Sequence, residues 1–283
     1  MHRLPAPRFL AAIDLDGTLF DHDGQVGAEN LAALDRLVGR GYGVVLASGR
    51  HPQNMAGIAA ALPHVRAIVA CQGGEVCDRT RGRILAQHFM QAADVALVVA
   101  AGLSAGFGVV AYTEHGEHAP RECPDVERYR RIAKTVVECV SPAVFAAERV
   151  FKVMWIAEEA RLEAFLAAGG AAGCRPAAAD SVRSHREVFE YGPRWVTKAT
   201  GTAVVARELG IAAADVAAFG DADNDVPLFT WAGFSAAMPH ARPEVRRRAT
   251  VTAPAGPAES AFARAVDLLL ATPSPAPATP ARP

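Results

Sequence analysis

Short apolar runs alternate with amphipathic stretches in the first part of the chain. The runs at 9–13, 43–47 and 67–70 consist almost entirely of apolar residues, and each stops at a polar or glycine-rich segment. Between the first two runs, residues 29–39 carry leucine and valine at helical spacing, and a second helix is expected after Pro52. Strands that alternate with helices in this way predict a parallel sheet with helices on both faces.

The pattern changes near residue 89 and returns near residue 188. Between these points, helix-like and strand-like stretches follow in an irregular order at 92–101, 107–112, 150–156, 158–168 and 182–191. The regular alternation resumes with stretches at 197–209, 216–219, 226–231, 234–237 and 259–270. We therefore predict an α/β fold, a Rossmann-like, doubly wound parallel sheet core with an inserted α+β cap domain.

The same change of pattern sets the expected domain bounds. The core comprises residues 1–88 and 188–271, and the cap domain comprises residues 89–187. Residues 272–283 are rich in proline, and we expect them to form an extended, unpacked tail.

Polar and glycine residues gather where the predicted strands end. They are Asp14 and Asp16 after the first strand, Ser48 and Gly49 after the second, Gln72 and Gly73 after the third, and Asp221, Asn224 and Asp225 after the strand at 216–219. Lys198 opens the helix before that last strand. Open parallel sheets bind ligands beyond the carboxyl ends of their strands, so we expect these groups to meet in one site.

The oxygen atoms of this set determine the chemistry that it can perform. Oxygen ligands without a Cys or His partner suit Mg²⁺, which proteins hold with one or two carboxylates, waters and a phosphate. A phosphoryl group in transfer needs its oxygens neutralised, which a cation, a lysine, a hydroxyl and backbone N–H groups can do. One carboxylate can attack phosphorus, and a second can protonate the leaving oxygen and then activate water.

Composition and charge argue against nucleic acid and membranes as partners. The chain has 283 residues, of which 51% are hydrophobic and 21% charged, so it is long enough for a large packed core. The net charge of −1 gives no general attraction to nucleic acid, and no apolar run is long enough to span a membrane. The five cysteines contain no C-x-x-C pair, which favours free thiols in a reducing compartment, so we expect a cytoplasmic protein.

Taken together, these motifs resemble those of the haloacid dehalogenase superfamily of phosphatases. The similar segments are Asp14-Leu15-Asp16-Gly17-Thr18 for the first motif, Ser48 in Ala47-Ser48-Gly49-Arg50 for the second, Lys198 for the third, and Gly220-Asp221-Ala222-Asp223-Asn224-Asp225 for the fourth. The resemblance covers about residues 9–270. The insert between the second and third motifs resembles the large cap of the Cof-type subfamily (class IIB cap).

The resemblance implies a Mg²⁺-dependent phosphatase that acts through an aspartyl-phosphate on a small phosphate ester, typically a sugar phosphate. It implies that Asp14 is the nucleophile and Asp16 the general acid and base. The phosphoryl group would be bound by Ser48, Gly49, Lys198 and Asn224, and the metal by Asp14, Asp16, Asp221 and Asp225. We expect this small molecule as the partner, with no nucleic acid or membrane, and a monomer or homodimer.

Several residue assignments stay open at the level of sequence. Asp225 could instead form a structural ion pair with Lys198, and Ser48 could act only as a helix N-cap. Arg50 could bind substrate or cap a helix end. Gln72 and Gly73 are weaker substrate-binding candidates, because Gln-Gly stands where the family often has Asn-Gly.

Two other functions fit the same motifs. A phosphomutase would return the phosphate to a reoriented sugar and release no inorganic phosphate. A phospholigand-binding protein without turnover is disfavoured, because every charged motif position is filled. Pro239-His240-Ala241 stands where the family often has Gly-Asn-Ala, which affects substrate choice more than the reaction.

Overall fold

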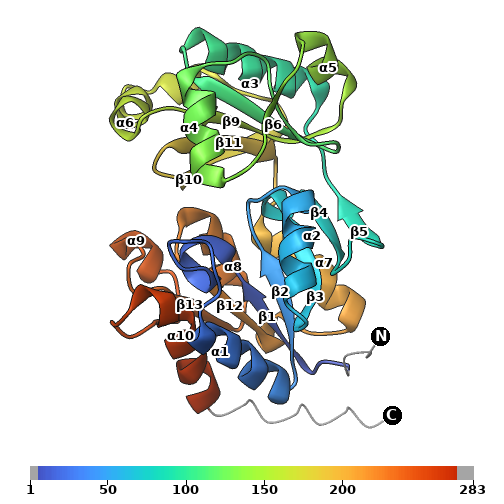
Figure 1. The fold of residues 1–283 in the computed structure, drawn as a ribbon, viewed down its shortest axis with the longest axis vertical. Coiled ribbons are helices and arrows are strands. Elements are labelled where there is room, and N and C mark those ends of the chain that lie inside the picture. The colour runs from blue at the N-terminus through green and yellow to red at the C-terminus, as the bar shows by residue number, and fades with distance from the viewer. Residues whose placement is uncertain (1–5, 273–283) are drawn as a thin grey trace.

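The computed structural model describes residues 6–272 as two packed units. In Figure 1 the lower unit is built from the blue and the orange-to-red parts of the chain, and the upper unit from the green and yellow part between them. The upper unit is therefore an insert, the cap, in the lower unit, the core. The predicted tail lies, apart from Thr272, outside the described residues.

The core is built on eight strands. They are β1 (Phe9–Ile13), β2 (Tyr42–Ala47), β3 (Val65–Ala70), β4 (Glu75–Asp78), β5 (Ile84–Gln87), β12 (Val216–Gly220), β13 (Phe234–Ala237) and β14 (Val251–Thr252). Their order in the sheet is β14-β13-β12-β1-β2-β3-β4-β5, parallel from β14 to β3 and antiparallel at β4 and β5. Because β1 lies between β12 and β2, the carboxyl ends of these strands are neighbours.

Helices cover both faces of the core sheet. One layer contains α1 (Ala28–Gly39), α2 (Pro52–Ala61) and α10 (Ala261–Ala271), and the other contains α7 (Lys198–Leu209), α8 (Val226–Trp231) and α9 (Pro243–Arg246). Along β1, Ala11 and Ile13 pack with the first layer, whereas Leu10 and Ala12 pack with the second. Burial on both faces explains the unbroken apolar run and confirms the predicted doubly wound fold.

The cap contains a second sheet. Its strands are β6 (Gly108–Thr113), β7 (Glu117–Ala119), β8 (Glu138–Cys139), β9 (Val150–Ile156), β10 (Ala179–His185) and β11 (Val188–Pro193), in the order β10-β11-β9-β6-β7-β8. Its helices are α3 (Ala92–Ser104), α4 (Pro124–Ala133), α5 (Pro142–Ala147) and α6 (Glu159–Ala167). Helices α3 and α6 pack around Trp155 on one face, and α4 covers the other.

The cap ends later than the sequence predicts. Strand β11 pairs antiparallel with both β9 and β10, so the cap sheet continues to Pro193 instead of stopping at residue 187. Residues 186–187 form the turn between β10 and β11. A polar turn inside a hairpin has the same sequence character as a linker between domains, which places the predicted boundary too early.

No helix in the described part of the chain is long and apolar enough to cross a membrane.

Candidate active site

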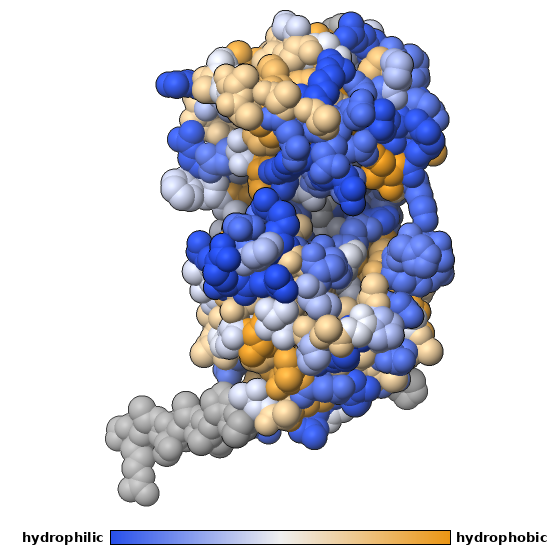
Figure 2. Space-filling model, turned by 90° about the vertical axis from the view of Figure 1, so that its left-hand side faces the viewer, coloured by the Kyte–Doolittle hydropathy of each residue, from blue (hydrophilic) through white to orange (hydrophobic). Residues whose placement is uncertain are grey.

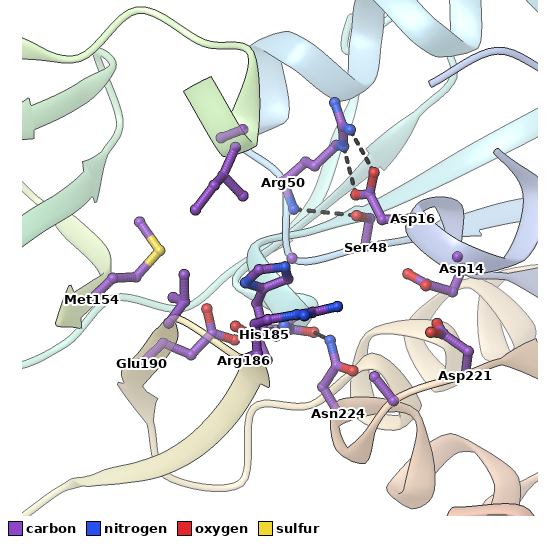
Figure 3. Close-up of a pocket in the computed structure, with 18 of the residues that line it drawn as sticks. Asp14, Asp16, Ser48, Arg50, Met154, His185, Arg186, Glu190, Asp221 and Asn224 are labelled. Carbon is purple, nitrogen blue, oxygen red and sulfur yellow. Dashed lines mark hydrogen bonds and ion pairs between the residues drawn. The ribbon is translucent and has the colours of Figure 1, made fainter. Parts of the chain in front are cut away.

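Three carboxylates meet where β1 and β12 end. Asp14 follows β1, Asp221 follows β12, and Asp225 lies in the short 3₁₀ turn Asp223–Asp225. Each offers a carboxylate oxygen, and these oxygens lie within 4.8 Å of one another. The two strands are parallel neighbours, so their polar extensions emerge side by side; Figure 3 shows Asp14 and Asp221 facing each other.

A buried lysine joins two members of this cluster. Lys198 Nζ lies 2.6 Å from Asp14 Oδ1 and 2.6 Å from Asp225 Oδ1. The other oxygen of Asp225 accepts the backbone N–H groups of Asp221 and Ala222 at 2.9 and 3.0 Å. Both oxygens of Asp225 therefore have partners, and the ion pair with Lys198 is the alternative that the geometry favours over a direct metal contact.

The balance of charge in the cluster is negative. Burial raises the pKa of Asp14 well above its ordinary value, and the carboxylates of Asp225, Asp221 and Asp16 raise it further, against the opposing effect of Lys198. Burial also raises the pKa of Asp221. Burial on its own would lower the pKa of Lys198, but Asp14 and Asp225 outweigh it and raise that pKa.

A divalent cation fits this set of donors. Crowded carboxylates with raised pKa values need a further positive charge to stay ionised together. The donors are oxygens alone, which suits Mg²⁺. Asp14 and Asp221 carry the oxygens available to hold it, and Thr18 Oγ1 supports Asp221 from 3.4 Å.

The backbone at Gly17 makes room for Asp221. Gly17 has φ +76°, and a Cβ there would lie 2.6 Å from Asp221 Oδ2. We expect Gly17→Ala to displace that carboxylate and to raise the Mg²⁺ concentration needed for half-maximal activity about 10- to 100-fold, as loss of a ligand's support does. Gly210→Ala is the matched control, because Gly210 has φ +68° and nothing within 4 Å of its Cβ position. An equal shift in both variants would show that backbone strain alone is responsible.

Ser48 lines the cavity above the carboxylates. It is buried at the end of β2, and its Oγ accepts the backbone N–H of Arg50 at 3.3 Å. The N-cap of α2 is His51, whose side chain accepts the N–H of Gln53. Ser48 is therefore not the cap of that helix, and its own O–H remains able to donate into the site.

Asp16 is turned away from the other carboxylates. Arg50 Nε and Nη2 donate to its two oxygens at 2.8 and 2.6 Å, and the Asp16 side chain is 58% exposed. The fork of the guanidinium matches a carboxylate, and this hydrogen bonding raises the pKa of Arg50. Arg50 lines the cavity, and its guanidinium is held by Asp16 instead of a helix end. Figure 3 shows this pair at one side of the site, apart from Asp14 and Asp221.

Gln72 and Gly73, the two weaker substrate-binding candidates at the end of β3, differ in their position relative to the cavity. Gln72 lines the cavity above the carboxylates, and its Oε1 accepts Asn224 Nδ2 at 3.2 Å. Gly73 does not line that cavity. It has φ +108°, and a Cβ there would lie 2.4 Å from the carbonyl oxygen of Thr197, so the absence of a side chain lets β3 approach α7. Gly73 is a packing residue, which corrects the prediction that it binds substrate.

A cavity of about 720 Å³ lies between the core and the cap. Asp14, Asp16, Ser48 and Asn224 line it from the core. Figure 2 shows the surface hollowed between the two units, with hydrophilic residues on both sides. The volume is enough for a phosphoryl group and a sizeable leaving group.

Several cavity residues escape the motif analysis. Those contributed by the cap include Tyr112, Tyr129, Lys152, Met154, His185, Arg186, Val188 and Glu190. His240, in the stretch that departs from the family pattern, lies 3.5 Å from Asp221. Two of these residues could have been found from the sequence. Lys152 and Glu190 are charged residues that interrupt the apolar runs 150–156 and 188–191.

Hydrogen bonds join α2 of the core to the cap. His51 Nε2 donates to the carbonyl oxygen of Thr113 at 2.8 Å. Asn54 Nδ2 and Thr135 Oγ1 donate to Glu117 Oε1 at 3.0 and 2.9 Å. Burial raises the pKa of Glu117 to about 7, although these two hydrogen bonds act to lower it.

This raised pKa predicts a pH-dependent stability. The folded chain keeps the Glu117 proton up to about pH 7, whereas the unfolded chain releases it near its ordinary pKa of 4.5. The free energy of unfolding should therefore fall as pH rises through this interval, by roughly 3 kcal/mol at most. Glu117→Gln should lack this component. Denaturant unfolding of both proteins across the interval measures it, and parallel pH profiles would contradict the assignment.

Comparison with known proteins agrees with this geometry. Residues 11–264 match the haloacid dehalogenase-like hydrolase family. HMP-PP phosphatase of Yersinia pestis is 26% identical over 243 residues, which cover 84% of this chain and 86% of that protein. The stress response protein YhaX of Bacillus subtilis is 40% identical over 72 residues, 25% of each chain.

Solved structures share the fold. The HAD subclass IIB sugar phosphatase BT4131 superposes with a TM-score of 0.79 at 17% identity, covering 92% of this chain and 98% of that one. BT1666 of Bacteroides thetaiotaomicron, a phosphatase of the same superfamily, gives 0.76 at 21% identity, covering 95% and 97%. The family match spans both parts of the core and the cap between them, so this chain belongs to the haloacid dehalogenase-like hydrolases and is an enzyme of their phosphatase type.

Proposed function

We propose that this enzyme is a Mg²⁺-dependent phosphatase that hydrolyses a small phosphate monoester through an aspartyl-phosphate on Asp14. The observation that carries the proposal is the environment of Asp14. Its Oδ1 is held by Lys198 at 2.6 Å, and its carboxylate lines the cavity beside Asp221. The described hydrogen bonds of this carboxylate all use Oδ1, so Oδ2 is free to attack phosphorus.

The remaining residues bind the phosphoryl group and move the proton. Ser48 Oγ–H, the backbone N–H of Gly49 and the amide of Asn224 donate to phosphoryl oxygens. Asp14 and Asp221, with the backbone carbonyl of Asp16, would hold Mg²⁺, which would supply positive charge for the transferring group.

Asp16 acts as the acid and base after its carboxylate leaves Arg50 and takes up a proton. It protonates the leaving oxygen, and Asp14 then carries the phosphoryl group. Asp16 next takes a proton from the water that hydrolyses this aspartyl-phosphate, which restores the Asp14 carboxylate and returns Asp16 to its protonated form. The cap keeps bulk water out during these steps.

The substrate is a small phosphate ester, and sugar phosphates are the first class to test. The structural neighbour BT4131 is described as a sugar phosphatase, and the relatives of this chain include an HMP-PP phosphatase. We place the enzyme in the cytoplasm, because the free cysteines Cys71, Cys77 and Cys174 are buried thiols. Monomer and homodimer are both compatible with the site.

Release of inorganic phosphate from a panel of esters tests the proposal. The panel contains sugar phosphates, HMP-PP and simple aryl phosphates, each with Mg²⁺ and then with excess EDTA. We expect release that stops when EDTA removes the metal. An ester that is isomerised without phosphate release would identify a mutase, and tight binding with no reaction would identify a binding protein.

A further inference from the structure

A chain of hydrogen bonds runs from the cap to the fourth motif. Lys152 Nζ contacts Glu190 Oε2 at 2.5 Å, and Gln72 Nε2 donates to Glu190 Oε1 at 2.6 Å. Asn224 Nδ2 then donates to Gln72 Oε1 at 3.2 Å. Lys152 and Glu190 belong to β9 and β11 of the cap, whereas Gln72 and Asn224 belong to the core. In this series of hydrogen bonds, Gln72 connects the cap to the core.

The Glu190 carboxylate of the cap determines which group donates and which accepts in each of these hydrogen bonds. The Glu190 carboxylate, paired with Lys152, can only accept, so Gln72 must turn its NH₂ group toward it. The carbonyl oxygen of Gln72 therefore faces Asn224, which must in turn present its own NH₂ group. Only one of the two N–H bonds of Asn224 is used by Gln72, and the other remains for the cavity that Asn224 lines.

The carbonyl oxygen of Asn224 supports the assignment of Asn224 as the donor to Gln72. Asn224 Oδ1 is buried and has no partner among the described residues. A buried acceptor without a partner is costly, so the amide would turn over unless its NH₂ group were held in place. In Figure 3 the Asn224 nitrogen carries the dashed line of the hydrogen bond to Gln72, and its oxygen lies on the side nearer Asp221.

We propose that Gln72 is a positioning residue that links cap closure to phosphate binding. When the cap brings Glu190 onto Gln72, the Gln72 amide is fixed, and it fixes Asn224 with an N–H directed at the phosphoryl oxygens. The inference rests on the proposed phosphatase function. It gives Lys152 and Glu190 a role in phosphate affinity, although both belong to the cap.

Two local features accommodate Gln72 in this position. Its backbone has φ +61°, a left-handed conformation that costs energy for a residue other than Gly or Asn. A Cβ on Gly49 would lie 2.7 Å from Gln72 Nε2, so the backbone after β2 needs a glycine there. Asn would suit this backbone better but is one methylene shorter, which is too short to keep both hydrogen bonds.

Binding of inorganic phosphate, measured by calorimetry on the full chain with saturating Mg²⁺, tests the proposal without turnover. Gln72→Asn should weaken phosphate binding about tenfold or more and lower kcat/KM by about 10- to 100-fold. Its Tm should be unchanged or higher. Gln87→Asn is the matched control, because Gln87 Nε2 also donates to a buried carboxylate, Glu75 Oε2 at 2.8 Å, away from the cavity. It should leave phosphate affinity unchanged.

Glu190→Gln tests the direction of the chain. In this variant Lys152 would donate to the carbonyl oxygen of the new amide. The NH₂ group of that amide would then face Gln72. The amides of Gln72 and Asn224 would both have to turn over to keep their hydrogen bonds. Phosphate affinity should therefore fall in Glu190→Gln as well. The double variant Gln72→Asn with Glu190→Gln should lose no more than the worse single variant, because both changes break one chain.

Each alternative has a distinct result. Gln72→Asn could leave phosphate affinity unchanged and lose activity only for esters with large leaving groups. That result would overturn the proposal and show that these hydrogen-bonded residues bind the leaving group. Additive losses in the double variant would also overturn it. If the wild-type protein releases phosphate from esters but binds no inorganic phosphate, this inference fails while the phosphatase function stands. Absence of release from every ester would overturn the phosphatase function itself.

Discussion

Asp14→Asn is expected to lower turnover by about four orders of magnitude or more, the scale on which enzymes lose activity with their nucleophile. Asn has the shape of Asp but no carboxylate to attack phosphorus. The fold should survive, because burial and three neighbouring carboxylates already disfavour the charge at this position. The variant keeps the second ion pair of Lys198, with Asp225 at 2.6 Å. Phosphate release and circular dichroism, measured together, separate loss of chemistry from loss of fold.

Asp16→Asn is the companion variant. With an aryl phosphate, whose leaving group needs no proton, Asp14 can still be phosphorylated, but the water that hydrolyses the intermediate has no base. Mass spectrometry after acid quenching should therefore find a phosphorylated chain in Asp16→Asn and none in Asp14→Asn. Turnover near the wild-type rate in Asp14→Asn, or a phosphorylated chain in that variant, would exclude the aspartyl nucleophile.

The core of the site could be predicted from the sequence because backbone geometry places it. Asp14 and Asp221 end adjacent parallel strands, and any sheet with β1 beside β12 brings them together. Lys198 is placed by the start of α7, whose N-cap is Thr197. Residues directly after strands and at helix starts have little freedom to lie elsewhere.

The rest of the site depends on side-chain direction and on how the cap sits over the core. Asp16 follows the same strand as Asp14, yet its carboxylate turns to Arg50, a choice that no strand rule decides. The contact between Gln72 and Glu190 joins residues 118 positions apart in two domains. Its two ends lie in the core and in the cap, so neither local periodicity nor motif spacing could indicate it.

Removing the charge of Lys198 is expected to cost both stability and activity. Lys198→Met keeps the length of the side chain but leaves Asp14 and Asp225 buried without a cation. Breaking a buried ion pair by removing one partner costs roughly 3–5 kcal/mol, so the free energy of unfolding at neutral pH should fall by about that much. Turnover should fall about 10³-fold, because Lys198 both holds the nucleophile and offsets charge on the phosphoryl group.

The pH dependence of this loss identifies its cause. Lys198 acts to lower the pKa of Asp14, so its removal raises that pKa further in the folded state. A carboxyl with a raised folded pKa loses stability as pH rises from its unfolded pKa up to the folded pKa, so the deficit of Lys198→Met should be small in acid and grow toward neutral pH. Lys152→Met leaves one uncompensated carboxylate instead of two and should lose less stability. Adding Asp14→Asn to Lys198→Met should restore part of the stability and none of the turnover. A deficit that does not change with pH would mean that the lysine stabilises the core by packing, and that the carboxylates do not depend on its charge.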